Sequence, residues 1–271
     1  MAGIQLNATL THRAVLSPEH AVFRVVLNDG PLPAFVPGQF AVLGLPGGAP
    51  RIPGADEDVD TRGTGRLIKR AYSITSSSVA KEYVEFYIAL VTSGALTPRL
   101  FALDVGDRLW MSSKFTGMFT LDKVPADKNV VFAATGTGIA PYMSMLRTHL
   151  AEYPSRKFAV LHGALHSWDL GYRAELEMFS RTFPNFTYIP ILSEPGYELE
   201  EWTGPHGFLQ DLWVIRPLDT IWGFAPEPAH THVFLCGNPL MIQNMKTILE
   251  EEGFAEHTKK TPGQIHMEKY W

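Results

Sequence analysis

The sequence predicts a two-domain protein, with an N-terminal antiparallel β-barrel followed by a C-terminal α/β domain built on a doubly wound parallel sheet. Its length of 271 residues corresponds to about two domains of average size. Up to about residue 120 the chain reads as short strands separated by turns, whereas beyond about residue 130 apolar strands alternate with helical patterns. We therefore expect a first domain over residues 1–123 and a second over residues 124–271, with the boundary near residues 121–126.

The first domain is expected to be all-β because its apolar segments are short and end at turn-forming residues. Residues 21–27 run into Asn28-Asp29-Gly30-Pro31, a strong turn signal. Further strands are expected at residues 40–45, 83–91 and 107–111. Short strands at this spacing are typical of an antiparallel barrel or sandwich. Residues 46–65 are rich in Gly, Pro and Asp, so we interpret them as a long exposed and mobile insertion without a function of its own.

The second domain is expected to be α/β because four apolar strands alternate with helices. Residues 130–134 form a continuous apolar run of the kind found in buried parallel strands, and further strands are expected at residues 158–161, 188–192 and 232–235. Apolar residues at helical spacing predict three helices: Ile139, Met143, Leu146 and Leu150; Tyr172, Leu176, Phe179 and Phe183; Met241, Met245, Ile248 and Leu249. The first two stop before Pro154 and Pro184, and Gly253 is the expected cap after the last.

Composition narrows the possible functions. The chain carries 23 Lys and Arg against 28 Asp and Glu, a net charge of −5, which argues against a dedicated nucleic-acid-binding protein. The single cysteine, Cys236, cannot by itself make an internal disulfide, a tetrahedral zinc site or an iron–sulfur cluster. No apolar run reaches the roughly 18 residues of a membrane helix, and residues 1–7 lack the features of a signal peptide. We expect a cytoplasmic protein whose electron carrier, if it has one, is organic or lies on another chain.

Two glycine-containing loops are candidate ligand sites. Gly136-Thr137-Gly138-Ile139-Ala140-Pro141 joins the first parallel strand to the first helix, where exposed backbone N–H groups favour a pyrophosphate. Pro141 replaces the third glycine of the dinucleotide fingerprint, and tight turns also use glycine for steric reasons alone, so both interpretations stay open. Cys236-Gly237-Asn238-Pro239 follows the fourth strand, and we expect it at the same sheet edge, facing the same crevice. Cys236 itself also suits the ordinary role of a small buried apolar residue.

Four motifs, in this order, resemble those of the ferredoxin/flavodoxin–NAD(P)⁺ reductase family: Arg70-Ala71-Tyr72-Ser73, Gly94-Ala95-Leu96-Thr97, the turn at residues 136–141, and the loop at residues 236–239. The chain also ends in Tyr270-Trp271, like a bacterial subgroup of this family. The resemblance implies an FAD-binding barrel, a pyridine-nucleotide domain with a C-terminal tail that returns to the flavin, and the activity of an FAD-dependent NAD(P)H:ferredoxin oxidoreductase. Its implied partner is ferredoxin or flavodoxin.

The resemblance also assigns residues to FAD, and several have a physical basis. The Tyr72 ring offers a flat apolar face on which the isoalloxazine can stack. The Ser73 hydroxyl can hydrogen-bond the flavin N5 region, and the planar Arg70 guanidinium suits the pyrophosphate. Thr97 is expected to be the N-cap of a short helix that begins with Pro98 and whose N–H groups hold the second phosphate. The implied set is Arg70, Ala71, Tyr72, Ser73, Tyr87, Ile88, Ala89, Ala95, Leu96, Thr97, Thr137, Tyr270 and Trp271. Apart from the family, Arg70 and Tyr72 also suit an ordinary strand, and residues 87–89 an ordinary barrel core.

The implied NAD(P) contacts are Gly136, Gly138, Ala164, Leu165, Ser193, Glu194, Cys236, Gly237 and Asn238, and the implied catalytic residues are Ser73, Cys236 and Tyr72. NADP-specific relatives carry arginines where this chain has Leu165, Glu194 and, near the following loop, Phe208. A carboxylate at position 194 suits a ribose diol better than a phosphate. We therefore expect NADH to be used at least as well as NADPH. The alternative is a phosphate contact from Arg173, Lys157 or His166.

Two further expectations concern the tail and the protein partner. Tyr270 and Trp271 are implied to stack on FAD as a lid that yields to nicotinamide, so their removal should loosen FAD and change nucleotide affinity. Because ferredoxins are usually acidic, docking on this acidic chain requires a local basic patch. The candidates are Lys69, Arg70, Lys114, Lys259, Lys260 and Lys269, each of which also suits an ordinary solvated position.

Three other functions stay open at this point. The chain also suits the reductase component of an oxygenase system, a flavin relay subunit of a larger complex, or a nucleotide-binding module without enzymatic activity. The sequence leaves the physiological acceptor, the direction of electron flow and the oligomeric state undecided, with a monomer as the default.

Overall fold

The computed structural model describes residues 5–58 and 65–268. The chain divides into two compact units, Met1–Thr120 and Leu121–Trp271. The first is built on an antiparallel sheet and the second on a parallel sheet with helices, so the expected fold class is confirmed. In the described part of the chain, no helix combines the length and the apolar character needed to cross a membrane.

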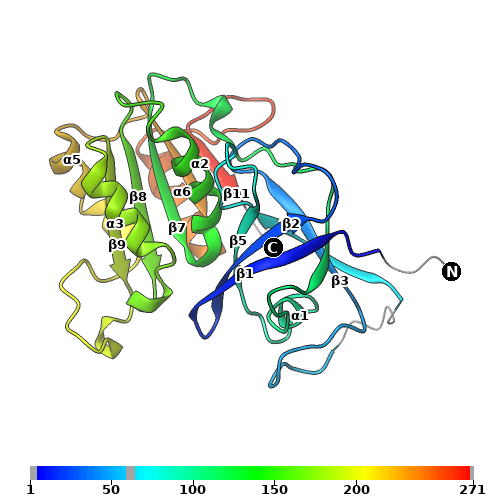
Figure 1. The fold of residues 1–271 in the computed structure, drawn as a ribbon. Helices are drawn as coiled ribbons and strands as arrows, with labels where there is room; N and C mark the ends of the chain where they lie inside the picture. The colour runs from blue at the N-terminus through cyan, green and yellow to red at the C-terminus, as the bar shows by residue number, and fades with distance from the viewer. Residues whose placement is uncertain (1–4, 59–64, 269–271) are drawn as a thin grey trace. The chain divides into compact units, whose positions relative to one another are not determined.

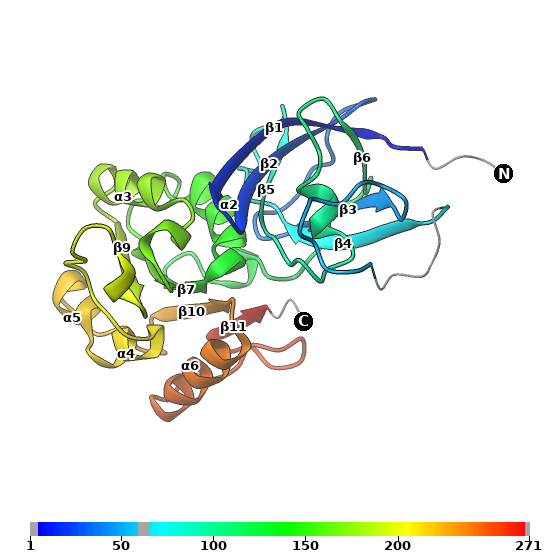
Figure 2. The same ribbon diagram turned by 90° about the horizontal axis from the view of Figure 1, so that it is seen from below.

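The first unit is a closed sheet of antiparallel strands in the spatial order β4-β3-β6-β1-β2-β5 (Figures 1 and 2). The strands are β1 Ala8–Ser17, β2 His20–Leu27, β3 Phe40–Pro46, β4 Leu67–Ser73, β5 Val84–Ala89 and β6 Arg108–Met111. Just after β4, an antiparallel bridge joins Ile74 to Phe86 of β5, and the Thr75 N–H donates to the Glu85 carbonyl at 2.8 Å. The two outer strands of the order therefore meet, which closes the barrel around a core that contains the fully buried Phe86.

The short helix α1 (Thr97–Leu100) starts one residue earlier than expected. Thr97 is its first helical residue, and the preceding Leu96 provides no side-chain cap. The Thr97 hydroxyl instead accepts from the Val91 N–H at 3.0 Å and donates to the Val91 carbonyl at 3.0 Å. The expectation of a Thr97 N-cap is therefore wrong, because this hydroxyl closes the loop before the helix and is not available to the helix N-terminus.

The loop after β3 is tied to the α1 region. Arg51 donates at 2.8 to 3.1 Å to three backbone carbonyls, those of Asp56, Thr92 and Gly94. The buried Arg99 of α1 donates to the Ala95 carbonyl at 2.6 Å and to the Asp58 carboxylate. The described part of residues 46–65 thus has a structural role, which its interpretation as an insertion without a function missed.

The second unit contains five parallel strands in the order β11-β10-β7-β8-β9. They are β7 Asn129–Thr135, β8 Phe158–Ala164, β9 Phe186–Leu192, β10 Thr231–Cys236 and β11 Ile265–Glu268. The chain runs outward from β7 through β8 to β9, then returns to the other side of β7 as β10. The carboxyl ends of β7 and β10 therefore mark the topological switch point, where ligands bind in open α/β sheets.

Helices cover both faces of this sheet. Figures 1 and 2 show α2 (Ile139–His149) and α3 (Arg173–Thr182) on one face, and α4 (Leu209–Val214), α5 (Pro217–Trp222) and α6 (Pro239–Glu251) on the other. The Phe132 ring of β7 stacks on Tyr142 of α2 with centroids 4.5 Å apart, while its neighbour Val131 belongs to the core on the opposite face. Strand β7 is thus buried on both faces, which explains its continuous apolar sequence. Gly253, with φ +90°, follows α6 as expected.

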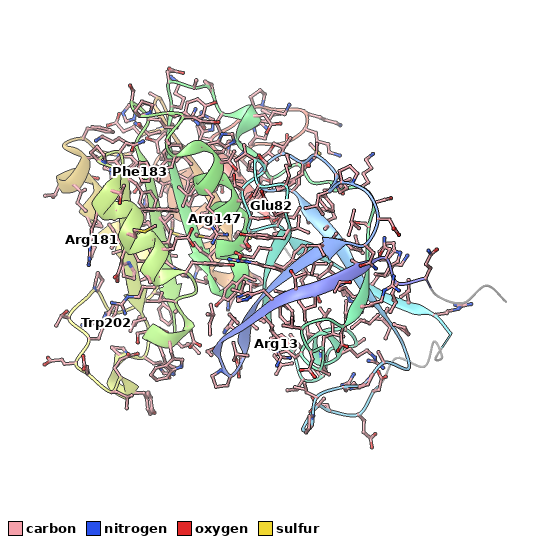
Figure 3. The ribbon with its side chains drawn as sticks, viewed as in Figure 1. Arg13, Glu82, Arg147, Arg181, Phe183 and Trp202 are labelled. Carbon is pink, nitrogen blue, oxygen red and sulfur yellow. The ribbon has the colours of Figure 1, made fainter. Side chains whose placement is uncertain are left out.

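The two helices on the first face are joined by a bidentate ion pair. Arg147 of α2 (Figure 3) donates through Nε and Nη2 to the two carboxylate oxygens of Glu175 in α3, at 2.7 and 2.6 Å. The same guanidinium lies 4.9 Å from the centre of the Tyr172 ring, just before α3. A fork-to-fork geometry of this kind fixes the two helices in a single arrangement.

Candidate functional site

The end of β4 carries the first group of candidate residues. Arg70 and Ala71 are exposed, Tyr72 is half-buried and Ser73 is buried. Arg70 and Tyr72 lie two positions apart and so project to the same face of the strand. Burial raises the pKa of the Tyr72 hydroxyl above its ordinary value, and the positive charge of Arg70 partly opposes this shift. The strand end therefore combines a flat ring with a guanidinium and, on the other face, a hydroxyl.

The bridge that closes the barrel places β5 beside this strand end. Tyr87 and Ile88 are buried and Ala89 is half-buried. The Tyr87 ring stacks on His20 with centroids 5.4 Å apart. The residues assigned to FAD on β4 and β5 thus lie at one seam of the barrel, whereas those at positions 95–97 lie at the start of α1.

Two glycine-containing loops interlock at the switch point of the parallel sheet. A Cβ atom on Gly138 would lie 2.2 Å from the Cys236 carbonyl oxygen, and one on Gly237 would lie 2.2 Å from Thr135 Oγ1. Thr135 Oγ1 also accepts the Asn238 N–H at 2.8 Å. The structure therefore brings the loops after β7 and β10 together, and Gly138 and Gly237 are glycines because each backbone touches the other loop.

Gly136 differs from these two glycines. Its φ is +54°, in the left-handed region, and nothing lies within 4 Å of the position of a Cβ atom. It opens the turn Gly136–Gly138 that leads into α2, with Thr137 half-buried beside it. Open space at the N-terminus of a helix of 11 residues leaves backbone N–H groups accessible to phosphate oxygens.

Cys236 is the last residue of β10 and is fully buried. Its burial fits the interpretation of a small apolar residue, while its position keeps it at the switch point. Two residues later, the exposed Asn238 caps α6, with its side-chain oxygen accepting the Leu240 N–H at 2.8 Å.

The segments that follow β8 and β9 lie side by side. The Ser193 N–H donates to the Ala164 carbonyl at 3.0 Å, and the Glu194 N–H donates to the Leu165 carbonyl at 3.0 Å. The side chains of Leu165 and Glu194 are both exposed. The structure thus brings together the four residues that the resemblance assigns to the nucleotide at these two strand ends.

A further contact at the same place, between Ser167 and Glu198, was not predicted from the sequence. The Ser167 N–H donates to Glu198 Oε1 at 2.7 Å, and the Ser167 hydroxyl donates to the other oxygen of that carboxylate. The neighbouring His166 ring lies 4.5 Å from the Trp168 ring, and its Nδ1 lies 3.2 Å from the Glu194 carbonyl oxygen. Ser167 and Glu198 are 31 residues apart and belong to no motif, so no spacing pattern pointed to them.

Two of the three alternative phosphate contacts lose support. Lys157 precedes β8 and therefore lies at the amino edge of the sheet, about 23 Å from the carboxyl end at 3.3 Å per residue. A 2′-phosphate contact from Lys157 is therefore wrong. Arg173 pairs with Glu177 at 2.7 Å, and its guanidinium lies 5.1 Å from the centre of the Trp202 ring (Figure 3).

The remaining candidates concern the tail and the basic patch. Tyr270, Trp271 and Lys269 lie outside the described residues. Lys69, Arg70, Lys114, Lys259 and Lys260 are all exposed. Residues 259 and 260 lie in a turn in which Thr258 Oγ1 accepts the Thr261 N–H at 3.0 Å. Within residues 5–58 and 65–268, no group of three or more His, Cys, Asp or Glu side chains could hold a metal ion.

Comparison with known proteins gives the family. Residues 132–247 match the family model described as the oxidoreductase NAD-binding domain. Ferredoxin–NADP reductase B of Sorangium cellulosum is 30% identical over 243 residues, covering 89% of this chain and 88% of the relative. Flavodoxin/ferredoxin–NADP reductase of Buchnera aphidicola is 29% identical over 254 residues, covering 92% and 93%. The fold matches a crystal structure of a ferredoxin NADP⁺ reductase from Neisseria gonorrhoeae with bound FAD and NADP, with a TM-score of 0.80, 23% identity and 98% of each chain covered. The chain therefore belongs to the flavodoxin/ferredoxin–NADP reductase family.

Proposed function

We propose that this chain is an FAD-containing reductase that exchanges hydride with NAD(P)H and single electrons with ferredoxin or flavodoxin. The observation that carries the proposal is the interlocked pair of loops at the switch point, because the open side of Gly136 at the start of α2 suits a pyrophosphate. Relatives named as flavodoxin/ferredoxin–NADP reductases support the partner class. We place the protein in the cytoplasm, with a monomer as the default state.

The residues at the barrel seam fit FAD. Bound FAD would supply a carrier that takes up two electrons as hydride and releases them one at a time. The Tyr72 ring would stack on it, the exposed Arg70 would bind its pyrophosphate, and the buried Ser73 hydroxyl would hydrogen-bond near flavin N5. The other residues proposed to line FAD are Ala71, Tyr87, Ile88, Ala89, Ala95, Leu96, Thr97, Thr137, Tyr270 and Trp271.

The second unit would bind and orient the nucleotide. Backbone N–H groups at Gly136 and Gly138 would hold its pyrophosphate, and the buried Cys236 would leave room for the nicotinamide ring at the switch point. Ala164, Leu165, Ser193 and Glu194 would line the adenosine ribose. No side chain has to act as a strong acid or base, because positioning and exclusion of water are the main tasks of the protein.

A flavin spectrum and a nucleotide titration test this function. The purified protein is expected to be yellow and to lose its flavin absorbance when titrated with NADH or NADPH without oxygen. The reduced protein should then reduce ferredoxin or flavodoxin. A colourless protein that binds nucleotides would support the non-enzymatic module, and reduction of an oxygenase component alone would support that alternative.

Docking of the protein partner is predicted to depend on Lys260. Lys260→Glu is expected to raise KM for ferredoxin at low salt by about fivefold, the effect of about 1 kcal/mol from one exposed charge. The effect should fade at high ionic strength because salt screens exposed charges. Steady-state kinetics at two salt concentrations measure both effects.

The matched control is Arg181→Glu, which makes the same change of charge at an exposed position near the end of α3 (Figure 3). Reduction of ferricyanide, a small acceptor, should be unchanged in both variants. Equal effects of the two substitutions on ferredoxin, or none at all, would exclude a docking role for Lys260.

A further inference from the structure

In the second unit, the carboxylate of Glu198 lies where the 2′-phosphate of a nucleotide would be bound. In nucleotide-binding α/β domains, a residue at the end of the second strand contacts the 2′ position of the adenosine ribose. A carboxylate there binds the diol of NAD, whereas an arginine binds the 2′-phosphate of NADP. In this chain that strand is β8, which ends at Ala164. The side chains just beyond it therefore decide which nucleotide is accepted.

The donors at this strand end are already occupied. Ser167 offers a backbone N–H and a hydroxyl, and both donate to the Glu198 carboxylate, the N–H at 2.7 Å. A backbone N–H and a hydroxyl on one residue are hydrogen-bond donors that a phosphate could use. The Glu198 carboxylate thus occupies both donors. A 2′-phosphate would have to displace this carboxylate or lie beside it.

The charges nearby strengthen this exclusion. Glu194 is exposed next to the β8 end, and Glu200 and Glu201 line the groove that adjoins Ser167 and Glu198. Arg173 lines the same groove, but it pairs with Glu177 at 2.7 Å. The field around Ser167 is therefore negative, which disfavours a dianionic phosphate more than a neutral hydroxyl.

We propose that Glu198 is a specificity-determining residue that makes this enzyme prefer NADH to NADPH. The inference rests on the proposed function, since it concerns the nucleotide that supplies hydride. Glu198 acts by occupying the Ser167 donors, and Glu194 adds to the effect by its charge. Leu165, exposed at the same strand end, provides no positive charge that would compensate.

Glu198→Gln tests the proposal with minimal change of shape. The amide oxygen still accepts one hydrogen bond from Ser167, but the amide nitrogen cannot accept the second. One Ser167 donor is therefore released, and the negative charge is lost. The expected result is a rise of about tenfold or more in kcat/KM for NADPH, with kcat/KM for NADH almost unchanged. Glu200→Gln is the matched control: it removes one charge from the same loop, without a contact to the Ser167 donors among those described, and should raise the ratio of kcat/KM for NADPH to that for NADH far less than Glu198→Gln does.

Binding of nucleotide fragments separates specificity from a purely structural role. Calorimetry on the FAD-loaded protein should show that Glu198→Gln strengthens binding of 2′,5′-ADP and leaves 5′-ADP unaffected. A loosened loop would weaken both, and that result would overturn the proposal. So would a wild-type protein whose kcat/KM is higher for NADPH than for NADH, or equal effects of Glu198→Gln and Glu200→Gln. If neither nucleotide reduces the flavin of the wild type, the proposed function itself fails.

Discussion

Gly138→Ala is expected to destabilise the second unit by more than about 3 kcal/mol, beyond the usual range for overpacked sites. The added Cβ would lie 2.2 Å from the Cys236 carbonyl oxygen and 2.5 Å from its carbon. Both are backbone atoms of the neighbouring loop, so no side-chain rotation can relieve the contact. Either the turn after β7 or the loop after β10 has to move. Hydrogen exchange of peptides from β7 and β10 measures the loss.

Two other glycines serve as controls for this prediction. Gly196→Ala should leave stability unchanged, because nothing lies within 4 Å of its Cβ position. Gly136→Ala has equal space but a φ of +54°, which costs about 1 kcal/mol for a residue with a side chain. It should also weaken nucleotide binding, since its methyl group projects into the space proposed for the pyrophosphate. If Gly138→Ala were as mild as Gly196→Ala, the interlocking of the two loops would be disproved.

The sequence predicted most of the elements because their signals are local. Strand β7 is a continuous apolar run, and α2 shows apolar residues at helical spacing, so each could be recognised from its own residues. Strand β11 could not be recognised, because its four residues, Ile265 to Glu268, are too few for their alternation to stand out, and the strand depends on pairing with β10. Helices α4 and α5 have six residues each and are separated by Ile215 and Arg216, so each is too short for a helical period to appear.

In the candidate site, too, the local motifs could be predicted from the sequence, whereas the tertiary contacts could not. The glycine loops at residues 136–138 and 236–238 could be found because each is a contiguous motif. The steric reason for Gly138 could not, since it depends on a backbone from the other side of the sheet. The Ser167–Glu198 contact joins residues 31 apart through the return of the chain after β9. Tertiary contacts of this kind leave no spacing signal, and they are what distinguishes this nucleotide site from a generic one.

Acidification is expected to destabilise the second unit strongly, because three of its histidines are buried as neutral rings. His162 is fully buried, its Nδ1 lies 3.2 Å from the Tyr188 hydroxyl, and its Nε2 has no hydrogen-bond partner among the described residues. Burial lowers the pKa of His162 to about 3. His232 and His266 lie 3.0 Å apart, Nδ1 to Nε2. Burial, and then the charge of His257, lowers the pKa of His232 to about 4. Burial, and then the charge of His232, lowers that of His266 to about 3.

Because the pKa of His162 is lower in the folded chain than in the unfolded chain, acidification lowers the free energy of unfolding. The unfolded chain takes up a proton on His162 below about pH 6.5, whereas the folded chain does so only near pH 3. Stability from this residue is therefore complete above about pH 6.5 and falls as the pH decreases towards 3. Between pH 7 and pH 5 the loss is about 2 kcal/mol for His162 alone. His232 and His266 add to it in the same direction.

Hydrogen exchange of β8 peptides at pH 7, 6 and 5, corrected for the intrinsic exchange rate and with saturating FAD, measures this loss. His162→Gln removes the titrating ring, so the decrease between pH 7 and pH 5 should shrink by about 2 kcal/mol, even if the variant is less stable at pH 7. His206→Gln, at an exposed position of the same unit, should keep the wild-type slope. An unchanged slope in His162→Gln would mean that the ring takes up its proton without loss of the fold, through opening of its contact with Tyr188 to water.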